Sequence, residues 1–167
     1  MGLFNFIKEA GEKLFGTGEA KAAQEAAAKD PSADKLAAAN AKAAEAIANY
    51  VRTLNLPIEG LSVVFDGAAG VVSVGGTTPD QATREKVLLA AGNVAGVGEV
   101  QDTIVVTNPE PEAKFHTVAR GDTLSAIAKT YYGSANKYMV IFEANKPMLS
   151  HPDKIYPGQM LRIPAQG

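Results

Sequence analysis

A polar segment in the second half of the chain, TNPEPEA at residues 107–113, most constrains what the sequence can fold into. The segment contains two prolines and two acidic residues, and it has no large apolar side chain to anchor it in a core. Segments of this composition connect domains. Because 167 residues can form one ordinary domain or two small ones, we predict two small domains joined by a linker at residues 108–113.

The part before the linker alternates between helix and strand signals. Apolar residues recur at steps of three and four in residues 41–56, which predicts an amphipathic helix. Two β-branched runs, LSVVFDG and GVVSVGG, are separated by Asp-Gly and a further glycine, which predicts a β-hairpin. A second helix is expected to start after Thr78 as its N-cap, with Pro79 in its first position. The later stretch EVQDTIVV is typical of a half-buried strand. We predict an α+β domain over residues 41–107, with the order helix, strand, strand, helix, strand.

The first 40 residues divide into two segments of different composition. Residues 1–15 carry several apolar side chains between charged ones and are predicted to form a short helix that docks on the following domain. Residues 16–40 are rich in Ala, Lys, Glu and Gln with almost no large apolar residue. This composition favours helix but offers little to pack, so we predict a helical spacer.

The part after the linker has its own set of elements. The stretch FHTVARGDTLSAIAKTYYG indicates a short strand and then a helix that starts near Asp122 or Thr123 and stops at Gly133. A second helix is expected in NKYMVIFEANKP and a closing strand in IYPGQMLRIP, after a Pro-Gly turn. We therefore predict a second α+β domain over residues 114–165, with the order strand, helix, helix, strand.

Composition excludes several classes of protein. The net charge is −2 and the basic residues are scattered, unlike the basic surface of a nucleic-acid-binding protein. There is no cysteine and there are only two histidines, His116 and His151, which argues against disulfides and structural zinc. We find no nucleophile elbow, phosphate-binding loop or His–carboxylate set with a convincing spacing, so we predict that the protein is not an enzyme.

The sequence also bears on location. No apolar run reaches about 18 residues and no cleavable signal is recognisable, so we expect a cytoplasmic protein. The apolar residues near the N-terminus raise the alternative of a membrane-surface helix. Its two lysines, Lys8 and Lys13, are balanced by Glu9 and Glu12, whereas interfacial helices usually present a basic face to lipid. We therefore expect no membrane association.

The stretch AAGNVAGVGEV at residues 90–100 contains three glycines directly after the second predicted helix. The last four carbonyl groups of a helix lack intrahelical partners and carry the negative end of the helix dipole. If Gly96 ends this helix, the carbonyls of residues 92–95 could face a cation, and no carboxylate lies between Gly92 and Gly98. The alternative is that these glycines only cap the helix and allow a tight turn.

Two resemblances to known families follow from longer blocks of sequence. HTVARGDTLSAIAKTYYG, IFEANKP and IYPGQMLRIP, at these spacings, resemble a LysM domain. GLSVVFDGAAGVVSVGG and AGNVAGVGEVQDTIVV resemble a BON domain. The combination, with MGLFNF and KEAGEKL at the N-terminus, is similar to the family of bacterial cytoplasmic potassium-binding proteins built from BON and LysM. The chain departs from this family in an Ala-rich insertion at about residues 16–45.

The resemblance implies a monovalent-cation site made of backbone carbonyls. The positions that match are Ile7, Lys8, Ala10, Gly92, Val94 and Val97. Potassium is the implied ligand, with rubidium and caesium as further ions that such a site accepts. The implied function is potassium sensing, with compaction on binding and a role in the stress response; the sequence identifies no downstream protein partner.

The LysM resemblance also implies an alternative function, in which an envelope module binds peptidoglycan. The matching groove positions for a glycan are Gly121, Asp122, Thr123, Leu124, Ile155 and Tyr156. Without an export signal the chain would not meet cell-wall glycan, so we favour the potassium-binding interpretation. In a purely structural interpretation, Asp122 caps a helix that Thr123 opens.

Overall fold

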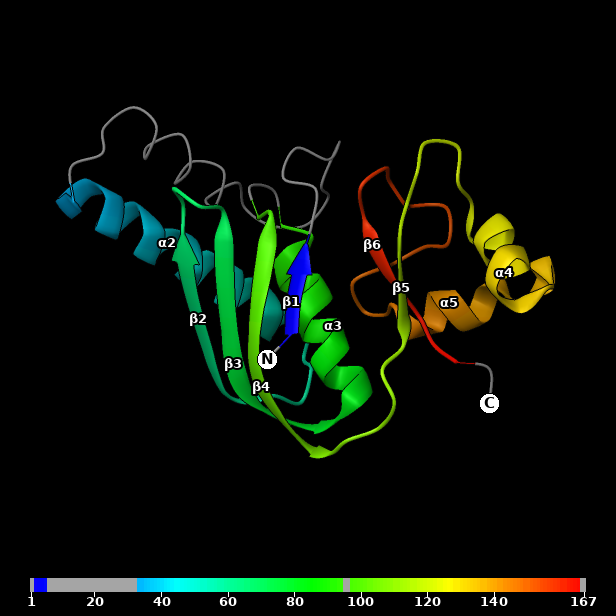
Figure 1. The fold of residues 1–167 in the computed structure, drawn as a ribbon, viewed down its shortest axis with the longest axis horizontal. Coiled ribbons are helices and arrows are strands. Elements are labelled where there is room, and N and C mark those ends of the chain that lie inside the picture. Colours follow the sequence, from blue (N-terminus) through cyan, green and yellow to red (C-terminus); the bar gives the residue numbers. More distant parts are fainter. Residues whose placement is uncertain (1, 6–32, 95–96, 166–167) are drawn as a thin grey trace.

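The computed structural model describes residues 2–5, 33–94 and 97–165, which form two units (Figure 1). The first unit contains β1 (Gly2–Asn5), α2 (Ala33–Thr53), β2 (Glu59–Asp66), β3 (Val71–Asp80), α3 (Gln81–Gly92) and β4 (Glu99–Asn108). The second contains β5 (Lys114–Thr117), α4 (Leu124–Tyr132), the 3-10 turn η1 (Ala135–Lys137), α5 (Tyr138–Ala144) and β6 (Met160–Ile163). The predicted α+β fold class is confirmed.

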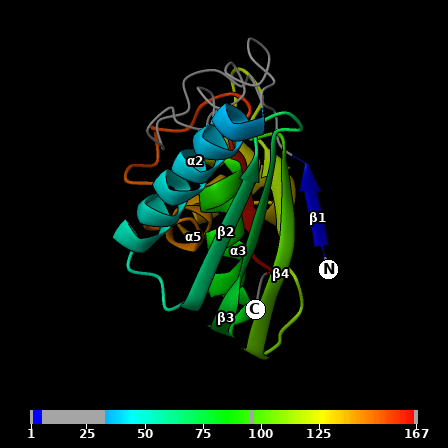
Figure 2. The same cartoon turned by 90° about the vertical axis from the view of Figure 1, so that its left-hand side faces the viewer.

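The first unit is a four-stranded sheet in the order β1-β4-β3-β2, covered on one face by α2 and α3 (Figure 2). Strands β2 and β3 form the predicted antiparallel hairpin, whereas β3 and β4 are parallel and are connected through α3. Side chains on the strands alternate between the covered and the open face, so Val72, Val74 and Val100 are completely buried. Their packing against the two helices forms the core of this unit.

The N-terminus differs from its prediction. The prediction of a helix over residues 1–15 is wrong for residues 2–5, which form strand β1. This strand pairs antiparallel with β4, from Gly2 opposite Asp102 to Asn5 opposite Glu99. Without β1, one edge of β4 would expose unpaired N–H and C=O groups, and pairing satisfies them. Residues 6–32 lie outside the described residues. Helix α2 begins at Ala33, so the predicted boundary between spacer and domain at residue 41 falls inside a helix.

The start of α3 also differs from its prediction. Thr78 is not the N-cap, because β3 continues through Thr78 to Asp80 and pairs there with β4. The cap is Asp80, whose carboxylate accepts the N–H of Thr83 at 2.7 Å. Hydrogen bonds from the Thr83 side chain and backbone hold the pKa of the Asp80 carboxyl below its usual range. The pairing of β3 with β4 thus overrides the helix-start signal at Thr78 and Pro79, and the helix begins after Asp80.

The second unit has the predicted order of strand, helix, helix, strand. Strands β5 and β6 pair antiparallel, and α4 begins after Thr123, whose side chain accepts the N–H of Ala126. Gly133 ends α4 in the left-handed conformation, with φ of 74°, which glycine adopts without steric cost. Its own core consists of residues from both helices, β6 and the intervening loops.

We expect Asp80→Ala to lower the free energy of unfolding by about 1 kcal/mol at neutral pH, because the first turn of α3 loses its cap. Since the folded-state pKa of Asp80 is lowered, its contribution is present above the pKa of the unfolded chain and is lost as the pH falls. Urea unfolding of both proteins at pH 7 and in acid measures this. Asp153→Ala, at a carboxylate that is 91% exposed, is the control and should change stability by less than about 0.5 kcal/mol. An equal loss at both pH values would contradict the capping role.

Candidate functional site

Helix α3 ends at the start of the glycine-rich stretch. Its last residue is Gly92, and the N–H of Asn93 bonds to the carbonyls of Leu89 and Ala91. The helix therefore does not extend to Gly96, as one interpretation of the sequence required. The negative end of its dipole lies at Gly92.

The segment from Asn93 to Gly98 is held to its surroundings at both ends. The N–H of Val97 donates to the carbonyl of Val94 at 3.1 Å, and the N–H of Gly98 donates to the carbonyl of Gly70, in the β2–β3 turn, at 2.8 Å. The side chains of Val94 and Val97 are both buried in the core of the first unit. Residues 95 and 96 lie outside the described residues. The buried side chains of Val94 and Val97, two of the predicted cation-binding residues, thus hold the backbone of this segment in place.

The three other predicted residues, Ile7, Lys8 and Ala10, lie outside the described residues, but the chain that leads to them is placed. Asn5, the last residue of β1, lies opposite Glu99, the first residue of β4 (Figure 1). The chain therefore leaves β1 at the end of the sheet where the segment after α3 enters β4. Ile7 and Ala10 follow Asn5 by only a few positions.

This end of the sheet offers backbone carbonyls and isolated acidic residues, such as Glu99 at the start of β4. Within the part of the chain that the structure describes, no three His, Cys, Asp or Glu side chains gather in a group that could hold a metal ion. Calcium and magnesium sites normally recruit carboxylates, whereas carbonyl oxygens can replace the hydration shell of potassium.

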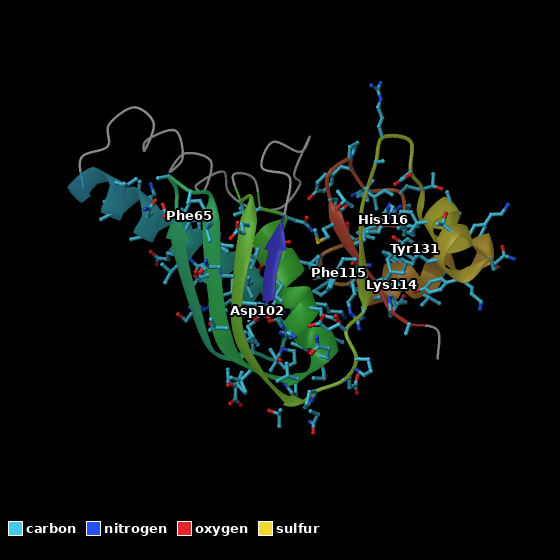
Figure 3. All side chains as sticks on the ribbon, viewed as in Figure 1. Phe65, Asp102, Lys114, Phe115, His116 and Tyr131 are labelled. Atoms are coloured by element: carbon cyan, nitrogen blue, oxygen red, sulfur yellow. The ribbon has the colours of Figure 1, made fainter. Side chains whose placement is uncertain are left out.

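A buried ion pair between α3 and β4 holds the helix to the sheet. The Asp102 carboxylate on β4 is 2% exposed and accepts the guanidinium of Arg84, with the Nε of Arg84 at 2.7 Å (Figure 3). The same carboxylate accepts the N–H of Ile104 at 2.8 Å. These bonds fix the rotation of α3 against β4, and hence the direction of its C-terminal carbonyls.

The second unit docks directly on α3. The Glu85 carboxylate of α3 is 1% exposed and accepts the Nε of Arg162 on β6 at 3.2 Å and the linker N–H of Ala113 at 3.1 Å. Phe115, on the side of β5 toward α3, packs with Met160 against the core of the first unit (Figure 3). The sequence did not predict this interface, because polar residues at single positions of a helix also fit a solvated face.

The Asn93 side chain forms a second polar contact in this interface. Its Nδ2 donates to the carbonyl of Met160 and its Oδ1 accepts the N–H of Met160, both at 3.0 Å. The C-cap residue of α3 is thus bonded to a strand of the second unit.

Several of the predicted glycan-groove residues have structural roles. Thr123 caps α4, whereas Leu124 and Tyr156 are buried and Ile155 is half-buried. Gly121 is exposed, with φ of +91°. Of the six positions, Gly121 and Thr123 therefore present the most surface to a ligand.

The remaining position, Asp122, does not cap α4. Its Oδ2 accepts the N–H of Ala119 and lies 2.9 Å from the Nε2 of His116, whose Nδ1 lies 3.1 Å from the hydroxyl of Tyr131 (Figure 3). The Ala119 N–H and then the His116 ring hold the pKa of the Asp122 carboxyl below its usual range. Both ring nitrogens of His116 thus have partners within the second unit.

Comparison with known proteins agrees with this architecture. Residues 116–164 match the LysM domain family. The chain is 45% identical over 166 residues to the potassium binding protein Kbp of Escherichia coli O6:H1, which covers 99% of this chain and 100% of that protein. It is also 51% identical over 49 residues to an uncharacterized protein of Deinococcus radiodurans, over 29% of this chain and 19% of that protein.

The fold and the match over residues 116–164 define a protein with an N-terminal α+β unit followed by a LysM domain. Given the similarity over nearly its whole length, the chain belongs to the family of the potassium binding protein Kbp.

We expect Glu85→Ala to lower the free energy of unfolding by about 3 kcal/mol, because it leaves the largely buried Arg162 guanidinium without its carboxylate. The double variant Glu85→Leu/Arg162→Met should recover most of this loss, since both charges are then removed. A double-mutant cycle by urea unfolding, with the single variants Glu85→Leu and Arg162→Met, measures the coupling. Glu143→Ala, which breaks the exposed pair with Lys146, is the control and should cost less than about 1 kcal/mol. Additive effects of the two interface substitutions would contradict the proposed coupling.

Proposed function

We propose that this protein binds one potassium ion through backbone carbonyl oxygens and serves as a cytoplasmic potassium sensor. The observation that carries this proposal is the similarity over 99% of the chain to a protein named for potassium binding. The proposed ligands are the carbonyls of Gly92, Val94 and Val97 at the end of α3, with those of Ile7, Lys8 and Ala10 after β1. On this proposal the protein is a binding protein rather than an enzyme.

Three features support a site at this place. The C-terminal end of α3 brings a partial negative charge of about half an elementary charge to Gly92. The donors there are neutral carbonyls, which suit a weakly hydrated monovalent ion better than a divalent one. Asn5 pairs with Glu99, so the chain after β1 and the chain before β4, which carry the proposed ligands, are connected to the same end of the sheet. The β-hairpin, helix and strand of the first unit also agree with its resemblance to a BON domain.

A site assembled from separate segments responds to its ion by compaction. Binding favours conformations in which both segments face the ion, and it shifts the population only by the difference in affinity between the compact and open states. Rubidium and caesium, which are also weakly hydrated, should compete with potassium. A sensor that compacts in this way would suit a response to osmotic or ionic stress.

The cytoplasmic location belongs to this proposal. None of the helices within residues 33–94 and 97–165 combines the length and the apolar composition needed to cross a bilayer. The strongest support for location comes from the proposed ligand, because potassium is the main monovalent cation inside cells.

We expect isothermal titration of the potassium-free protein with KCl to give saturable heat with a stoichiometry of one. NaCl at the same ionic strength should give none, since the smaller sodium ion holds its hydration shell more tightly. Potassium at 100 times its dissociation constant should also stabilise the fold by about 2.7 kcal/mol. Equal responses to both salts would contradict a selective site.

Amide NMR spectra should locate the site. A carbonyl that contacts an ion shares its peptide group with the next residue's N–H, so potassium should most strongly shift the amides of residues 8, 9, 11, 93, 95 and 98. The amides of α4, in the second unit, serve as the internal control and should move little. Large shifts confined to α4 and β5 would place the ion elsewhere and contradict the proposed ligands.

The LysM match favours a second candidate function, the binding of N-acetylglucosamine chains such as peptidoglycan. The groove would be formed around Gly121 and Thr123, the exposed positions among those proposed. We expect only weak retention in a sedimentation assay with purified cell wall, because Leu124 and Tyr156 are buried and cannot contact a sugar without rearrangement. Strong retention that Thr123→Arg abolishes would instead support the glycan function.

A further inference from the structure

Strand β6 is short, and its two edges are covered in different ways. One edge pairs with β5 of the same unit. Along an antiparallel strand, the N–H and C=O of alternate residues point to the same edge. On the other edge, the backbone groups of Met160 and Arg162 are bonded to two asparagine side chains rather than to another strand.

The two asparagines bind β6 with the same pattern. Asn93 donates to the carbonyl of Met160 and accepts its N–H, both at 3.0 Å. Asn145 donates to the carbonyl of Arg162 at 2.9 Å and accepts its N–H at 2.8 Å. All four distances are those of well-formed hydrogen bonds, and both side chains are at least 95% buried.

The two asparagines differ in where they come from. Asn145 follows α5 and belongs to the same unit as β6, so its bonds only stabilise the LysM domain. Asn93 caps α3 in the first unit, 67 positions before Met160. It lies between Gly92 and Val94, two of the proposed potassium ligands. Asn93 therefore joins β6 to the proposed site.

The backbone of Asn93 strengthens this connection. Its N–H bonds to the carbonyls of Leu89 and Ala91, and it belongs to the same planar, trans peptide group as the Gly92 carbonyl. The N–H and C=O of such a group point in opposite directions, so the Gly92 oxygen points away from the helix. A side chain anchored to β6 and an N–H anchored to α3 together fix the direction of that oxygen.

We propose that Asn93 is a positioning residue for the potassium site, and that through it β6 of the LysM domain holds the carbonyls at the end of α3 in place. This inference rests on the proposed function. A site made of backbone carbonyls has no ligating side chain to tune, so its affinity depends on how firmly the supporting contacts hold the backbone. Asn93 supplies that contact from the second unit.

The test compares Asn93→Ala with Asn145→Ala in the full-length protein by titration with KCl. Each variant removes one donated and one accepted bond to β6, at Met160 for Asn93 and at Arg162 for Asn145. Asn145→Ala also removes the bond to the carbonyl of Ile141, so it is a stringent control for the loss of such bonds. We expect Asn93→Ala to weaken potassium affinity about tenfold, which corresponds to about 1.4 kcal/mol and is the size of one or two lost hydrogen bonds. Asn145→Ala should weaken it by less than about threefold.

A spectroscopic signature separates positioning from general destabilisation. In the wild-type protein, potassium should shift the Met160 amide, because its N–H donates to Asn93. In Asn93→Ala that shift should disappear, whereas in Asn145→Ala it should remain. If Asn93→Ala does not fold, Asn93→Leu, which keeps the number of side-chain heavy atoms while removing both bonds, replaces it in the same measurements.

The outcomes for the two proposals are distinguishable. Wild-type affinity in Asn93→Ala, or equal losses in the two variants, would overturn the positioning role while leaving potassium binding intact. A wild-type protein that does not bind potassium would overturn the proposed function, and this inference with it.

Discussion

The arrangement of this protein depends on the burial of α3 between two partners. The sheet covers one side of the helix, where Arg84 bonds to Asp102, and the LysM domain covers another, where Glu85 bonds to Arg162. A helix that connects two parallel strands must pack on their sheet, but nothing in that connection requires a second domain on its outer side. The linker residue Ala113 also donates to Glu85, so the linker itself takes part in the packing. The two units are consequently joined by a polar interface as well as by a chain connection.

Local patterns in the sequence predicted much of the fold, and the failures share a physical cause. The β-hairpin and the order of elements in the LysM domain were confirmed because turn glycines, caps and apolar spacing act within a few residues. The helix start at Thr78 and a helix at residues 2–5 were wrong, because in both places pairing with β4 determined the backbone conformation. Long-range pairing has no local signature, so a pattern of single residues could not have revealed it.

For the candidate site, too, local patterns predicted one part and long-range contacts determine the other. The glycine-rich stretch predicted a break after the second helix, and α3 does end there, at Gly92, with Val94 and Val97 buried just beyond it. The resemblance, rather than the pattern, supplied potassium as the ligand and the residues after β1 as its other half. The roles of Glu85 and Asn93 depend on residues more than 65 positions away, and only the three-dimensional arrangement brings them together.

The pairing of β1 with β4 also has a consequence for how the protein folds. Gly2 meets Asp102, so β1 joins the sheet only after a loop of about 100 residues has closed, which is entropically costly and slow. During synthesis, the hairpin and α3 emerge long after β1, which must wait for β4 before it has a partner. A four-residue strand at the sheet edge is also a candidate for local opening without global unfolding. The N-terminal strand should therefore be the last to join the fold and the first to leave it.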